Sequence, residues 1–464
     1  MFIWLLTNRE KRDTINDMEK AFGKRSWSIL ILFGLIGQIA WSVENMYFNV
    51  FLRGEVGASL DAVTLMVQLS GITATVITLL AGTLSDKLGN RRAFLSWGYV
   101  IWGITVALFG FLSPKYVGTI FGLPAEQAIT LAVVLVIVAD CVMTAFGSTA
   151  NDAAFNAWVT DNTETEYRGK VEGILSILPL AAMLIVAGGF GILKDVLGGY
   201  QNLFLALGIV ISICGVVGVF FVKDSPSLVS SGSFGDLFYG FKPSVIRKHK
   251  PLYVTLLIVG VYGIACQIFM PYLIIYMEEY LHFTVIEYSV VFATAILLGA
   301  AVNVYLTRLS DRVDKTKMLY LAAGIFAAGL LGMYFAKDLG HTADMIVFGV
   351  FGFVMITGNI LVSALSNSTV RDYTPEGAVG KLQGVRMVFS VLLPMVLGPM
   401  IGNAVNVARN LGEASTNAEL TTKVIPAPEI FLAAAGFSLL LFAVIPLLQR
   451  LAKKEKTDAA ENEI

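Results

Sequence analysis

A series of apolar runs, each about long enough to cross a lipid bilayer, constrains this chain more than any other feature. A hydrocarbon core is crossed by about 20 consecutive, mostly apolar residues in a helix. Hydrophobic residues make up 56% of the 464 residues and charged residues only 14%, a balance that does not fit a water-soluble surface. We therefore expect an all-α polytopic membrane protein. The composition excludes a nucleic-acid-binding protein and most soluble enzymes.

Charges, glycines, prolines and asparagines divide the chain into twelve apolar segments. We predict transmembrane helices over residues 27–51, 62–84, 93–113, 128–157, 171–192, 200–222, 251–276, 287–308, 318–336, 343–368, 382–406 and 428–449. The longest interior hydrophilic stretch separates the first six from the last six. The predicted parts, in order, are a cytoplasmic N-terminal segment, a six-helix bundle, a cytoplasmic linker, a second six-helix bundle and a cytoplasmic tail, at 1–26, 27–222, 223–250, 251–449 and 450–464.

The distribution of basic residues sets the expected orientation. With both termini placed on one side, the segments on that side hold 26 of the 33 Lys and Arg residues, and those on the other side hold six. Basic residues accumulate on the cytoplasmic side of membrane proteins. We therefore predict cytoplasmic termini and a plasma-membrane protein.

An internal repeat relates the two halves. Residues 84–87 read Leu-Ser-Asp-Lys after the second predicted helix, and residues 309–312 read Leu-Ser-Asp-Arg after the eighth. Asp161 and Asp372 correspond at an offset of 211 residues, as do the Gly-Lys pairs that follow them. Since each half has six crossings, both halves share one orientation, an arrangement that accompanies a central solute site and alternating access.

The clearest motif is Gly82-Thr83-Leu84-Ser85-Asp86-Lys87-Leu88-Gly89-Asn90-Arg91-Arg92. It resembles the loop signature between the second and third helices of the major facilitator superfamily, with Asn90 where a basic residue is usual. The resemblance implies the major facilitator fold of two six-helix bundles. We expect contacts between the halves, which close the cytoplasmic side and break during transport, to involve the gating residues Gly82, Asp86, Gly89, Arg91, Arg92, Asp161, Arg168, Asp311, Arg312, Asp372 and Lys381.

Two further segments are similar to one branch of that superfamily. Residues 152–161 and the following Arg168-Gly169-Lys170 resemble the end of the fourth helix in the glycoside-pentoside-hexuronide cation symporters and their sucrose-transporter-like relatives. Residues 37–45 are similar to the opening helix of the sucrose-transporter-like proteins. The resemblance implies that Asp152 belongs to a cation site. The second predicted helix lacks the aspartates of the melibiose-type sodium site.

Three carboxylates fall inside predicted helices. An ionised carboxylate at mid-helix costs about 2.5–3.5 kcal/mol on the insertion scale, so it normally faces a cavity or a partner. Glu44 lies in the first helix, and Asp140 and Asp152 lie in the fourth. We predict that these three residues couple transport to a cation, a proton or sodium.

Polar residues form stripes at helical spacing on four predicted helices. Amides and carboxylates can meet pairs of sugar hydroxyls, and an aromatic ring can stack on the apolar side of a sugar. Polar side chains also hold helices together in membranes, so each stripe has a second interpretation. The predicted substrate-binding residues are Gln38, Trp41, Asn45, Thr144, Asn151, Tyr262, Gln267 and Asn359.

These patterns predict a secondary active transporter that imports a sugar or glycoside by cation symport, with the proton favoured. One alternative is a proton-coupled exporter of drugs or metabolites, and another is a non-transporting solute sensor on the same scaffold. An enzyme is not expected, because no metal-ligand cluster, nucleophile–base pair or phosphate loop stands out. We expect no cofactor, no metal, no disulfide among Cys141, Cys214 and Cys266, and a monomer in the bilayer.

Overall fold

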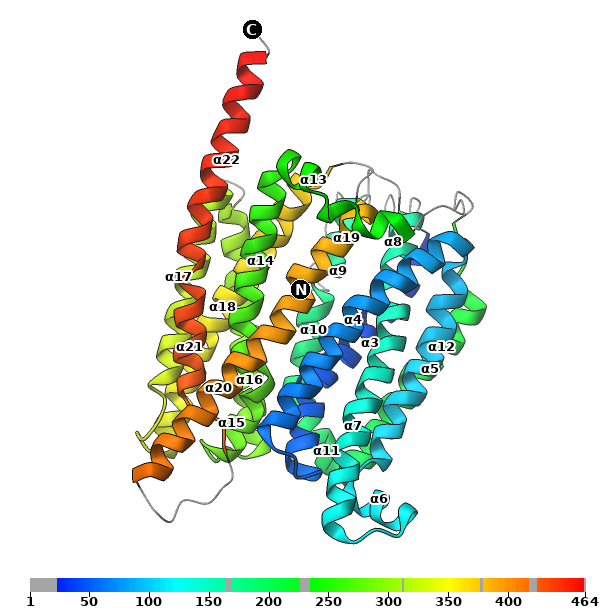
Figure 1. Cartoon of the computed structure of the whole chain (residues 1–464), viewed down its shortest axis with the longest axis vertical. Helices are drawn as coiled ribbons and strands as arrows, with labels where there is room; N and C mark the ends of the chain where they lie inside the picture. Colours follow the sequence, from blue (N-terminus) through cyan, green and yellow to red (C-terminus); the bar gives the residue numbers. More distant parts are fainter. Residues whose placement is uncertain are drawn as a thin grey trace, which may run out of the picture.

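The computed structural model describes residues 23–163, 168–225, 234–310, 313–375, 379–416 and 424–462. Within these ranges the chain is helical and contains no strand. Twelve helices in the described ranges are long and apolar enough to span a membrane, as predicted. We number these spans in chain order. The fold class is that of an all-α polytopic membrane protein built from two six-helix bundles (Figure 1).

Several spans combine more than one helical element. The elements of the first half are α3 (Lys24–Val43), η1 (Glu44–Phe48), η2 (Phe51–Glu55), α4 (Leu60–Leu88), α5 (Arg91–Leu108), η3 (Phe109–Phe111), α6 (Pro114–Phe121), α7 (Ala125–Gly147), η4 (Ser148–Phe155), α8 (Asn156–Asn162), α9 (Arg168–Leu175), α10 (Leu178–Ile185), η6 (Val186–Phe190), α11 (Gly191–Val196) and α12 (Tyr200–Phe221). Those of the linker and second half are η7 (Phe234–Phe241), α13 (Pro243–Lys248), α14 (Lys250–Phe269), η8 (Met270–Tyr272), α15 (Leu273–Glu279), α16 (Val285–Ser310), α17 (Lys315–Tyr334), α18 (His341–Tyr373), α19 (Val379–Met387), η9 (Val388–Leu392), α20 (Leu393–Thr416), α21 (Glu429–Ser438) and α22 (Leu441–Asn462).

The spans agree with the predicted segments in number and order, and differ mainly in length. Span 4 runs over Ala125–Asn162 and span 10 over His341–Tyr373, so both continue well past the apolar cores predicted at 128–157 and 343–368. The extra turns are polar. Hydropathy detects only the part of a helix in contact with hydrocarbon, because backbone hydrogen bonding continues where the side chains become polar.

Close contact between spans 3 and 6 builds one side of the first bundle. A Cβ atom on Gly103 of α5 would lie 2.4 Å from the carbonyl oxygen of Gly208 in α12, and a Cβ on Gly208 would lie 2.4 Å from the carbonyl oxygen of Gly103. Small residues allow such approach of helix backbones in membranes. The obstacle is backbone on both sides, so neither helix can relieve it by a side-chain movement.

We expect Gly103→Ala to destabilise the first bundle by about 1–3 kcal/mol, the usual result of forcing an extra methyl group into a packed core. Gly352→Ala in α18 is the matched control, because a Cβ there meets nothing within 4 Å, and alanine favours a helix by about 0.5–1 kcal/mol over glycine. Thermal unfolding of both variants in detergent checks the prediction. Equal melting temperatures would contradict the packing described for Gly103.

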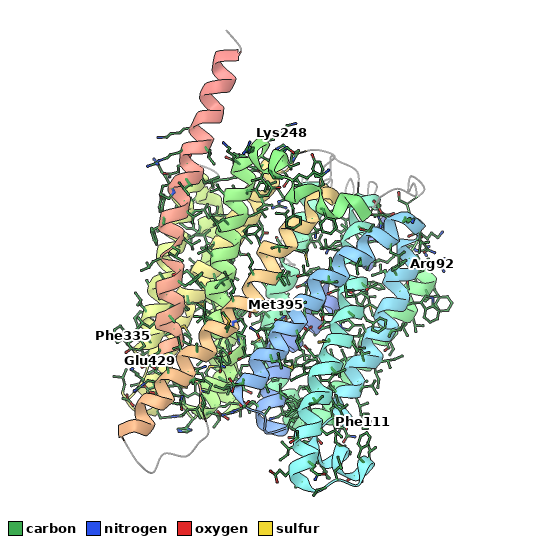
Figure 2. The ribbon with its side chains drawn as sticks, in the orientation of Figure 1. Arg92, Phe111, Lys248, Phe335, Met395 and Glu429 are labelled. Atoms are coloured by element: carbon green, nitrogen blue, oxygen red, sulfur yellow. The ribbon has the colours of Figure 1, made fainter. Side chains whose placement is uncertain are left out.

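The two bundles meet along a limited set of helices. Spans 2 and 11 cross, where Gly71 of α4 packs against Met395 of α20, at the place labelled in Figure 2. Spans 5 and 8 meet through α16, which contacts α10, η6 and α11. Spans 1 and 7 meet where η1 approaches η8. The polar stripes predicted from the sequence lie on spans 1, 4, 7 and 10.

Candidate functional site

Two of the three predicted carboxylates, Glu44 and Asp152, lie in π-helical turns, whereas Asp140 lies in the regular α-helix α7. Span 1 changes from an α-helix to a π-helix at Glu44, and span 4 changes at Ser148, shortly before Asp152. π-Helical turns are rare in proteins as a whole, but those that occur are often found at functional sites. Such a turn changes the direction in which side chains project. Span 1 contains a second π-helical turn, η2, toward its end.

Glu44 is held by hydroxyl groups from two other spans. Its side chain is 6% exposed. Ser70 of span 2 donates a hydrogen bond to Glu44 Oε1 at 2.7 Å, and Thr144 of span 4 donates to the same oxygen at 3.0 Å. The two hydroxyl oxygens lie 2.9 Å apart. Three helices thus converge on one buried carboxylate.

Asp140 lies one helical turn before Thr144 and is 1% exposed. Its carboxylate interacts electrostatically with Glu44 and also with the Ser70 hydroxyl. Glu44 Oε2 and Asp140 Oδ1 are both buried without a hydrogen-bond partner. Among the described residues, neither carboxylate forms an ion pair. Two buried like charges with no base beside them are unfavourable unless a bound cation neutralises one.

Asp152 occupies a different environment farther along span 4. Ser148 donates a hydrogen bond to Asp152 Oδ2 at 3.1 Å, and the carboxylate also interacts with Trp41 of span 1. Trp41 is half-buried and packs against Trp102 with a ring-centroid distance of 5.0 Å. A carboxylate thus lies beside a partly accessible indole ring, a combination suited to a hydroxyl-bearing ring such as a sugar.

The other polar residues predicted in the first half have mixed surroundings. Thr144 donates a hydrogen bond to Glu44, so its hydroxyl is part of the carboxylate site and not of the surroundings of Trp41. Asn151 is buried and donates to Tyr99 Oη at 2.7 Å, and a Cβ on the neighbouring Gly37 would collide with its amide. Its amide nitrogen is therefore engaged in packing, which favours the interpretation as an interhelical contact. Asn45 is exposed and Gln38 half-buried on span 1.

In the second half the structure brings together two of the three predicted residues. Tyr262 of α14 donates a hydrogen bond to Asn359 Oδ1 of α18 at 2.9 Å, and Asn359 Nδ2 lies 3.5 Å from Cys266 Sγ. Both Tyr262 and Asn359 are half-buried. Gln267 is also half-buried, but its backbone and Cβ pack closely against Gly398 of span 11. Spans 7 and 10 thus supply a small polar cluster.

In the first half, three of the predicted gating residues contact one another. Arg91 forms ion pairs with Asp86 and, at 3.0 Å, with Asp161, and it donates to Ser85 Oγ at 2.6 Å. All three partners belong to the first bundle. We expected contacts between halves. The structure instead shows the loop after span 2 held to the end of span 4.

Local backbone requirements account for other residues of the motif. Gly89 ends α4 with φ 59°, a left-handed conformation that glycine adopts without strain. Asn90 accepts a hydrogen bond from Ala93 N at 2.9 Å and caps α5, which explains an asparagine where the signature usually has a basic residue. Arg92 donates its backbone N–H to Asp224 at 2.8 Å. Gly82 packs with Ala153 nearby.

The matching region of the second half is only partly described. Asp372 forms an ion pair with Lys315, again within one bundle. Asp311 and Arg312 lie outside the described residues, and the side chains of Arg168 and Lys381 lie outside them too. Asp311 and Arg312 therefore stay predictions, as do the roles of Arg168 and Lys381.

Sequence reasoning missed two functional candidates. Ser70 was one of many hydroxyl residues in span 2, and only its contact with Glu44 distinguishes it. Arg53 was counted among the charges of an outer loop, yet it is 4% exposed and paired with Glu279 of the other half. No periodic signal could have found either residue, because each is defined by a contact between distant segments.

The architecture and the polar core match a known family. The family model of the Major Facilitator Superfamily matches residues 30–399. The chain belongs to the major facilitator superfamily. It is therefore a multi-pass membrane transporter and not an enzyme.

Solved structures of major facilitator transporters share the fold at low sequence identity. A mutant of the nucleoside transporter NupG aligns with a TM-score of 0.65 at 12% identity, covering 90% of this chain and 98% of that chain. A bacterial homologue of the human lysosomal transporter Spinster, inward-facing and unoccupied, gives 0.63 at 13%, covering 92% and 97%. A bacterial homologue of the iron transporter ferroportin, inward-facing, gives 0.61 at 14%, covering 91% and 98%. The comparison with curated proteins found no match.

Proposed function

We propose that this major facilitator transporter imports a sugar or glycoside together with a proton, by alternating access. In this proposal it lies in the plasma membrane with both termini in the cytoplasm, where most of its basic residues fall. The observation that carries the proposal is the buried pair Glu44 and Asp140, which share a hydroxyl-lined site without a basic partner among the described residues.

Electrostatics connects this pair to cation coupling. A buried site is shielded from the water that would screen its charges, so the repulsion between the two carboxylates is strong there. Uptake of one proton removes that repulsion. The oxygens of Glu44, Ser70 and Thr144 already lie 2.7–3.0 Å apart, so a proton is accommodated without moving them. Its binding favours the conformation in which the site is enclosed.

The solute is assigned from aromatic and polar groups of spans 1, 4, 7 and 10. Trp41 and Asp152 in the first bundle offer an aromatic face and a hydrogen-bond acceptor. In the second bundle Tyr262 and Asn359 bind each other, and the Tyr262 oxygen can still accept a hydrogen bond while the Asn359 amide has a second N–H to donate. A ring with several hydroxyl groups satisfies all four, whereas a flat apolar drug leaves buried polar groups unpaired. Cation and solute are coupled if each binds better when the other is present.

External pH in lightly buffered, de-energised cells that produce the protein tests this function directly. The panel contains disaccharides and glycosides, with and without sodium, and also nucleosides, because the structural neighbour NupG is described as a nucleoside transporter. Alkalinisation on addition of one sugar is the expected result. No pH change with any compound, with the protein shown to be in the membrane, would overturn proton symport and direct attention to sodium coupling or to export.

A further inference from the structure

A buried ion pair joins the two bundles at the end of the molecule opposite the Arg91 loop. Arg53 is the middle residue of η2 in span 1, and Glu279 is the last residue of α15 in span 7. Arg53 Nε donates to Glu279 Oε1 at 2.9 Å, and Arg53 Nη2 donates to Glu279 Oε2 at 2.9 Å. This two-pronged geometry is the strongest arrangement between a guanidinium and a carboxylate. Arg53 is 4% exposed, and Glu279 is 20% exposed.

Two backbone carbonyls complete the surroundings of Arg53. Its Nη1 donates to Ala58 O at 3.0 Å, in the loop between spans 1 and 2. Its Nη2 also donates to Val424 O at 2.8 Å, in the segment that leads into span 12. Arg53 therefore connects two segments of the first half with two of the second.

Other hydrogen bonds between the bundles lie near the same end. Asn403 donates to Asp61 Oδ1 at 2.6 Å. The hydroxyls of Thr64 and Tyr272 lie 2.7 Å apart. The described ion pairs of Arg91 and Lys315, at the opposite end, stay within single bundles. In the described part of the chain, these side-chain hydrogen bonds and the Arg53 ion pair thus join the bundles near the end that contains Arg53.

We propose that Arg53 and Glu279 form the outer gate of this transporter, and that their ion pair holds that end closed. When the bundles separate there, water supplies new partners to both charges, so the pair can break during the transport cycle. In the closed state both charges are largely buried. Removing one of them leaves the other at a largely buried position without its two-pronged partner, which destabilises this state relative to the open one.

Distances between spin labels on the purified protein test the gate without any transport assay. Cys141, Cys214 and Cys266 are first replaced by serine. One label pair, at Glu55→Cys and Ile286→Cys, reports on the Arg53 end. A second pair, at Leu88→Cys and Lys317→Cys, reports on the opposite end; all four native side chains are exposed. The variants compared are Arg53→Gln, Arg53→Lys and Glu279→Gln.

Arg409→Gln is the matched control. Arg409 lies 3.3 Å from Glu429 in an ion pair that stays within the second bundle. We expect Arg53→Gln and Glu279→Gln to raise the ratio of open to closed molecules at the Arg53 end about tenfold, equal to about 1.4 kcal/mol. Arg53→Lys keeps the charge without the two-pronged geometry, so it should have a smaller effect. Arg409→Gln should leave both distances unchanged.

An unchanged Glu55–Ile286 distance in both neutralising variants would overturn the gate. Equal changes in Arg409→Gln would overturn it too, because they would show a general effect of lost surface charge. The result does not depend on the solute or the coupling ion. Failure of the gate is therefore distinguishable from failure of proton–sugar symport.

Discussion

Glu44→Gln is expected to abolish accumulation of solute against its gradient while leaving exchange of solute across the membrane partly intact. Glutamine resembles the protonated acid in shape and charge, and its oxygen can still accept from Ser70 and Thr144. The loaded transporter can therefore change conformation, but no proton is released or taken up. Coupling free energies of about 1–3 kcal/mol correspond to about 5–150-fold, so we expect accumulation to fall by up to about 100-fold.

Measurement of uptake and of counterflow in the same vesicles separates these two activities. Asp344→Asn is the matched control, because Asp344 is also buried within a span, at 9% exposed, but accepts a hydrogen bond from Leu339 N far from Glu44. Wild-type accumulation by Glu44→Gln would remove Glu44 from the coupling mechanism. Loss of both accumulation and counterflow would indicate that the residue is needed for conformational change itself.

Trp41→Ala is expected to raise the KM for the transported sugar about 30-fold, with a smaller change in kcat. Loss of an aromatic anchor at a binding surface costs about 2 kcal/mol, which is about 30-fold in affinity. Trp41→Phe keeps an aromatic ring that can face Trp102, but it loses the indole N–H and part of the ring area. It should therefore retain most of the affinity. The concentration dependence of uptake gives KM and kcat for each variant.

Trp97→Ala serves as the control for loss of a tryptophan in the first bundle. Trp97 is 58% exposed on span 3, away from the polar groups of spans 1 and 4. Its KM should equal that of the wild type. Its kcat should also be unchanged once the maximal uptake rate is divided by the amount of protein in the membrane. An unchanged KM in Trp41→Ala would mean that the solute does not contact this ring, and the assignment of a sugar would lose its aromatic element.

Much of the fold was accessible from the sequence, because its strongest signal is local. An apolar run of about 20 residues predicts one membrane helix regardless of the rest of the chain. All twelve spans were placed in this way. The errors lie at polar helix ends, as in span 4, where backbone hydrogen bonding continues beyond the apolar region.

The candidate site was only partly accessible. Glu44, Asp140 and Asp152 were identified because a carboxylate inside an apolar helix is costly and therefore conspicuous. The division of their hydrogen-bond partners, with Ser70 serving Glu44 and Asp140 and Ser148 serving Asp152, was not predictable. That division depends on the packing of spans 1, 2 and 4 and on the π-helical turns that redirect side chains. Asn151 was predicted to bind substrate, but its side-chain amide donates a hydrogen bond to Tyr99.

The sequence alone thus determined the number of crossings, the internal repeat and the cost of each buried charge, all of which depend on residues close in the chain. The tertiary structure decided which residues meet. Ser70 joins Glu44 across 26 positions, and Arg53 joins Glu279 across 226. The residues next to a hydroxyl or a guanidinium in the sequence do not reveal its role, because that role depends on the partner that packing places within about 3 Å.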